Sequence, residues 1–94
     1  MKSIDWNGAA ECLRLLSHPH RLQLIALLLE QDYSVGELAG ACGVLQNVIS
    51  EHLNLMKHKG FVTSSRKKRR VYYSINEPML GLIIKCIKGR FSNS

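Results

Sequence analysis

The 94-residue chain has little of what a secreted or membrane protein needs. Its N-terminus lacks the apolar run of a signal peptide, and its longest apolar stretch, residues 22–29, is too short to span a bilayer. The three cysteines, Cys12, Cys42 and Cys86, are odd in number and widely separated, unlike a secreted disulfide framework. We therefore expect a cytoplasmic protein that makes no membrane contact.

Motifs for catalysis are also missing. The chain has no Gly-rich phosphate loop, no nucleophile elbow and no paired carboxylates, because its seven acidic residues are scattered. With two prolines and no repeat, low-complexity tract or linker, residues 1–94 are expected to form one small domain. We expect neither an enzyme nor a cofactor.

Acidic residues are outnumbered by 13 lysines and arginines, which gives a formal charge of +6 and a pI near 9.6. This balance favours a polyanionic partner, nucleic acid before membrane. The cations are most concentrated in one run, where charges of one sign repel unless an anion meets them. That run consists of Arg66, Lys67, Lys68, Arg69 and Arg70.

A helix-turn-helix is predicted over residues 34–59. Ser34 and Glu37 have the spacing of a capping box, and Gly43 stands where a helix ends in the left-handed conformation. A second helix then begins near Leu45. Its buried stripe is Ile49, Leu53 and Met56, and its opposite face is rich in amide and hydroxyl groups, which suits the DNA major groove. A solvated helix face beside a turn is the bland alternative.

Beyond Gly60 the pattern changes to strand alternation, which predicts a hairpin, or wing, over residues 61–75. Its two strands are expected at residues 61–66 and 69–75, with the cationic run at the tip. Because the tip would lie beside the polar helix, we expect it to contact backbone phosphates rather than to be merely solvated.

Helices are also predicted at residues 5–16, 19–30 and 77–89, which makes the fold mostly α with a small β-hairpin. The last helix carries two apolar stripes, more than one small core needs, so we expect a two-fold homodimer. Its recognition helices would then lie about 34–36 Å apart on double-stranded DNA. The expected interface residues, from the first and last helices, are Leu13, Met79, Leu82, Ile83 and Cys86.

This order of elements resembles the ArsR/SmtB family of bacterial winged-helix repressors, over residues 9–88. The resemblance rests on LLSHPHRLQLIALL (15–28), YSVGELA (33–39), Ser50-x-His52-Leu53, KGFV (59–62) and RVYYSI (70–75). It implies a dimeric repressor that sits on a near-palindromic operator until a signal releases it. A nucleoid-type protein without sequence specificity and a protein-interaction module are the alternatives.

Carried over by position, Gln46, Asn47 and Ser50 become candidates for base contacts on the recognition helix. His52 on the same helix either bonds a phosphate or packs at the helix edge. Two departures stand out, since the family often opens this helix with Ser or Thr instead of Leu45, and usually has Gly at the wing tip instead of Lys68.

Metal-sensing members carry a Cys-x-Cys box where this chain has Ser34-Val35-Gly36, or Asp and His ligands on the last helix, which has neither here. His18 and His20 are two residues apart, a spacing that does not share a helix face. We therefore expect no metal site and place the chain closest to the branch without the metal box.

Cys12 and Cys86 fall on the first and last helices, which are expected to pack together. A disulfide or persulfide between them would couple oxidation to the dimer, and two small buried hydrophobes are the favoured alternative. If the pair is a redox sensor, Cys12→Ser abolishes the release of operator DNA by oxidant in a gel-shift assay. Unchanged release would contradict the sensor.

Overall fold

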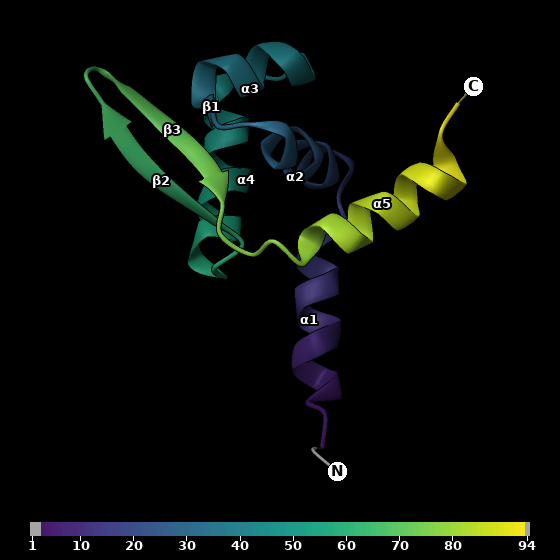
Figure 1. The fold of residues 1–94 in the computed structure, drawn as a ribbon. Helices are drawn as coiled ribbons and strands as arrows, with labels where there is room; N and C mark the ends of the chain where they lie inside the picture. Colours follow the sequence, from purple (N-terminus) through teal and green to yellow (C-terminus); the bar gives the residue numbers. More distant parts are fainter. Residues whose placement is uncertain (1–2, 94) are drawn as a thin grey trace.

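The computed structural model describes residues 3–93, so Met1, Lys2 and Ser94 of the predicted 1–94 domain lie outside it. Five helices and a small antiparallel sheet make up this part of the chain (Figure 1). None of the helices described is long and apolar enough to cross a membrane. In chain order the elements are α1 Trp6–Leu16, α2 Pro19–Glu30, β1 Tyr33–Ser34, α3 Val35–Cys42, α4 Gln46–His58, β2 Val62–Lys67, β3 Arg70–Ile75 and α5 Leu80–Phe91.

The core forms where α2, α3 and α4 meet the sheet. The predicted stripe of α4 is confirmed, because Ile49, Leu53 and Met56 are fully buried. From α2, Leu24 and Ile25 enter the same core. With its inner face fixed in this way, α4 turns its polar face away from the core.

The start of α3 is the predicted capping box. The backbone N–H of Glu37 donates to Ser34 Oγ at 3.2 Å, and that of Ser34 donates to Glu37 Oε1 at 2.9 Å. The bond from the Ser34 backbone N–H favours the ionised carboxylate and holds the pKa of Glu37 below its ordinary value. Gly43 ends α3 with a φ of 66°, and Leu45 opens α4 without a side-chain cap, both as expected.

One strand was not predicted from the sequence. Tyr33, expected in the linker before α3, and Ser34, expected only as the cap of α3, form β1 and pair with Tyr73 and Tyr72 of β3. The sheet order is β1-β3-β2. Ser34 therefore belongs to the sheet and also caps α3, so the wing and the helix-turn-helix are joined through one residue.

The two-residue turn of the wing lies one residue later than the predicted strands place it. Lys67 pairs with Arg70, which leaves only Lys68 and Arg69 in the turn. Lys68 has a φ of 59° and is the only non-glycine with positive φ among residues 3–93. Two-residue hairpins of type II′ normally place Gly at this first position, since a side chain there costs about 1–2 kcal/mol. The replacement of Gly by Lys68 thus gives a strained tip, not a wider one.

The last helix begins later than predicted. Residues 77–79 form a turn in which Glu77 and Pro78 carbonyls accept from Leu80 and Gly81 at 3.1 and 3.0 Å, and the helix then runs to Phe91. α5 packs on α2, whereas α1 extends away from the body in another direction (Figure 1). The expectation that the first and last helices pack along each other is therefore wrong within one chain.

The cysteines differ in their surroundings. All three are free thiols, and Cys12 and Cys42 are half-buried. Cys86 is exposed, so the interpretation of Cys86 as a small buried hydrophobic residue is wrong. Burial raises the pKa of the Cys42 thiol, which favours the neutral form and agrees with a structural role there.

Candidate nucleic-acid interface

The predicted base-contacting side chains lie on the outer side of α4. Gln46 and Asn47 in its first turn are exposed and Ser50 is half-buried, while Ile49 between them is fully buried. This geometry follows from helical periodicity, since a buried stripe on one face forces its neighbours outward. The first turn of α4 thus presents two amides and a hydroxyl to solvent.

An open groove joins α4 to the wing. Its lining includes Gln46 and Ser50 of α4 and Arg69 and Arg70 of the wing. Gly36 makes room for this arrangement, because a Cβ built on it would lie 3.0 Å from Nε2 of Gln46. The remaining lining residues are Ser34, Val35, Glu37 and Val71. The structure therefore brings two base candidates and two phosphate candidates together, a grouping that the sequence alone does not give.

All five wing cations are exposed on the hairpin tip and its flanks. Lys67 Nζ lies 5.8 Å from the centre of the Tyr72 ring, within cation–π distance. At the other end of the wing, Lys57 Nζ donates to Ser64 Oγ at 2.7 Å, which ties the end of α4 to β2. The wing is thus held to the helix beside it, with its charge left facing solvent.

His52 lies on the inner edge of α4, where only 8% of it is exposed. Its Nδ1 accepts a hydrogen bond from Arg21 Nε at 3.1 Å. Burial, followed by the nearby His18, Arg21 and His20, lowers the pKa of His52 below its ordinary value and favours the neutral ring. Of its two predicted roles, packing is the one in the structure, because a buried ring is poorly placed for a phosphate.

The positions of His18 and His20 differ from the expectation that the two side chains do not share a helix face. His18 is not on α2 but is its N-cap, and its Nδ1 accepts from the His20 backbone N–H at 3.1 Å. The helix-spacing argument therefore does not apply, and the two ring centres lie 5.1 Å apart. The prediction that these side chains diverge is wrong, because a capping residue turns its side chain back toward the helix.

A family model supplies the deciding comparison. The model described as "Bacterial regulatory protein, arsR family" matches residues 18–64, which is half of the chain and runs from the cap of α2 into β2. The chain belongs to the arsR family of bacterial regulatory proteins.

Its relatives in this family are named as regulators. The biofilm growth-associated repressor of Xylella fastidiosa is 32% identical over 81 residues, covering 86% of this chain and 71% of that protein. The regulator YgaV of Escherichia coli is 35% identical over 81 residues, covering 85% and 82%. The crystal structure of the Xylella fastidiosa repressor BigR superposes with a TM-score of 0.86 at 31% identity, covering 94% and 90%.

These matches and the winged helix-turn-helix agree on function. This arsR-family chain is a DNA-binding transcriptional regulator and not an enzyme, as the sequence predicted. The family match covers the helix-turn-helix with its exposed polar side chains and the start of β2, and it ends before the cationic residues 66–70 of the wing.

Two helices of this arsR-family fold leave large apolar side chains uncovered. On α1, Leu13 is 56% exposed, and on and before α5, Leu82 and Met79 are 61% and 63% exposed. Ile83 is half-buried, and Cys86 is exposed. Exposed apolar side chains gathered on these two helices indicate an interaction surface.

Proposed function

We propose that the protein is a dimeric repressor that acts in the cytoplasm on a near-palindromic operator. The observation that carries the proposal is the groove lined by Gln46 and Ser50 of α4 together with Arg69 and Arg70 of the wing. Amide and hydroxyl groups read base edges in the major groove, whereas arginines on a flanking hairpin neutralise phosphates. Both kinds of contact are thus available from one side of the molecule.

The dimer is proposed from the uncovered apolar surface on α1 and α5. Burying Leu13, Met79 and Leu82 against a second copy, with Ile83 and Cys86 at the edge, would remove these side chains from water. In the proposed dimer, a two-fold axis through this surface would bring two copies of α4 to one side, where they would enter successive major grooves about 34–36 Å apart. Each subunit would then read half of the operator.

Asn47 is expected to contribute to the choice of DNA sequence through a base contact. Asn47→Ala should weaken operator binding by about 1–3 kcal/mol, the usual cost of losing one base contact, while leaving random DNA unaffected. Fluorescence anisotropy with both DNAs at one salt concentration measures the two losses. Asn7→Ala, which alters an exposed asparagine on α1, is the matched control. Equal losses on both DNAs would assign Asn47 to the backbone instead.

Arg69 and Arg70 of the wing are expected to contact DNA phosphates. The double change Arg69→Ala, Arg70→Ala should weaken operator and random DNA alike, because phosphates carry no sequence information. The slope of log K against log salt should become shallower by about one unit for each phosphate that the wing no longer neutralises. A titration series across salt concentrations gives this slope. Lys85→Ala with Lys88→Ala, which removes two exposed cations from α5, controls for net charge and should leave the slope unchanged.

A further inference from the structure

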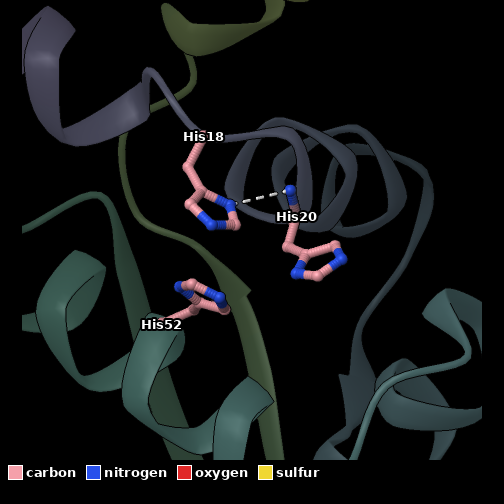
Figure 2. Close-up of side chains that lie close together, drawn as sticks. All are labelled: His18, His20 and His52. Carbon is pink, nitrogen blue, oxygen red and sulfur yellow. Dashed lines mark hydrogen bonds between the residues drawn. The ribbon is translucent and has the colours of Figure 1, made fainter.

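Three histidine rings from distant parts of the chain meet beneath the recognition helix. His18 precedes α2, His20 lies in its first turn and His52 comes from α4 (Figure 2). The ring centres are 4.5 Å apart for His18 and His52 and 5.7 Å apart for His20 and His52. One ring nitrogen of each residue lies within 4.8 Å of those of the other two. Three imidazole nitrogens are thus close enough together to be candidate ligands of one ion.

The nitrogens of this triad are not all accounted for by hydrogen bonds within the protein. Nδ1 of His20 is buried and has no hydrogen-bond partner, although buried polar atoms normally have one. The ring points toward the other two histidines (Figure 2). Its unused nitrogen is thus an independent sign that the triad has a ligand to receive.

We propose that His18, His20 and His52 form a binding site for a divalent transition-metal ion of the zinc type. Neutral imidazole is a preferred ligand of Zn²⁺, and three protein ligands leave a fourth position for water or another group. Zn–N bonds of about 2.0–2.1 Å put tetrahedral ligand atoms about 3.4 Å apart, so ligand atoms now up to 4.8 Å apart must approach by up to about 1.4 Å. Rotation about their side-chain bonds supplies that movement.

The proton positions define what the metal displaces. In the structure, Nδ1 of His18 accepts from the His20 backbone and Nδ1 of His52 accepts from Arg21, so Nε2 of each neutral ring carries the proton. A metal takes either the Nδ1 lone pair itself or Nε2 after the proton moves to Nδ1. Both routes break these two hydrogen bonds. His20 loses nothing, since its Nδ1 has no bond to break.

Metal binding at this place would release a link between helices. Arg21 donates to His52 on α4 and also, through Nη1, to the carbonyl of Leu15 on α1 at 2.8 Å. Loss of the bond to His52 uncouples α4 from the end of α1. The site lies at neither the start of α3 nor on α5, the two positions where metal-sensing relatives of the ArsR/SmtB type carry their ligands, and it needs no cysteine.

The test is Co²⁺ and Zn²⁺ binding to the untagged full-length protein without DNA, so its outcome does not depend on the proposed repressor function. We expect one ion per chain, with a tetrahedral Co²⁺ visible spectrum and no thiolate charge-transfer band. Competition with a chromophoric chelator gives the affinity. Histidine side-chain ¹⁵N resonances should shift for three of the four histidines.

Histidine variants distinguish the loss of a metal ligand from damage to the fold. His20→Leu removes a ring with no side-chain hydrogen bond, and His18→Asn keeps a capping side chain while removing the imidazole. Each should lower the affinity by about 100-fold or more, since even lost partners of metal ligands cost 10–100-fold. His58→Ala, an exposed histidine at the end of α4, should bind as tightly as the parent. Absence of stoichiometric binding, a thiolate spectrum, or equal affinity in His20→Leu and the parent would overturn the proposal.

Discussion

Leu82→Asp is expected to convert the protein to a monomer and to lower its affinity for a two-site operator by about 10²–10⁴-fold. Leu82 is 61% exposed in the single chain, so a carboxylate there costs the subunit fold little. In the proposed dimer the same carboxylate would be buried against an apolar surface, where an unpaired charge is strongly unfavourable. Sedimentation velocity gives the oligomeric state, and anisotropy with the whole operator gives the affinity.

Leu55→Asp is the matched control for this change. Leu55 is another exposed leucine, 47% accessible, but it lies on α4 and not on the helices of the proposed interface. It should leave the sedimentation coefficient of the parent unchanged. A Leu82→Asp protein that remains dimeric would show that α5 does not form the interface, whatever its DNA affinity.

Leu53→Ala is expected to cost about 2–5 kcal/mol of unfolding free energy, the range for deleting a buried leucine side chain. Leu53 lies on the inner face of α4, where it is fully buried in the core formed with α2 and α3. For a domain of this size the loss should lower Tm by about 10 °C or more. Thermal and urea unfolding followed by circular dichroism measure both quantities.

Leu55→Ala provides the comparison on the same helix. It removes the same atoms from a site that is 47% exposed, so it should change the unfolding free energy by only about 0.5 kcal/mol. A similar loss in both variants would mean that helix propensity, rather than burial of Leu53, sets the stability of α4. Partial unfolding of α4 in Leu53→Ala at 37 °C would also weaken every DNA contact made from this helix.

The helix-turn-helix could be predicted because its determinants are local. Ser34 and Glu37 are three residues apart, and the buried stripe of α4 repeats every three to four residues. The left-handed Gly43 is specified by its own lack of a side chain. Each of these features depends on near neighbours in the chain, so periodicity and capping rules are sufficient to find it.

The features that the sequence did not reveal depend on distant partners. β1 exists because Tyr33 pairs with Tyr73, forty positions away, and two residues carry no periodicity that could announce a strand. His52 meets Arg21 across 31 positions, and the triad forms only because a capping residue turns back over α2. The grouping of Gln46 with Arg69 likewise requires the wing to fold over α3. Each of these features depends on tertiary contacts, so the sequence pattern could identify the candidate residues but not the residues that they contact.

Ser34 sets a limit on how a signal can act. Because this residue belongs to β1 and caps α3, the wing cannot swing without disturbing the first helix of the DNA-reading pair. The hydrogen bond from Lys57 to Ser64 connects the wing to the C-terminal end of α4 as well. The DNA-facing half of each subunit should therefore move as a single rigid block. In the proposed dimer, an inducer would then change operator affinity by altering the distance or angle between the two subunits' DNA-facing halves. It would do so by acting on α1, α5 or the junction before α2.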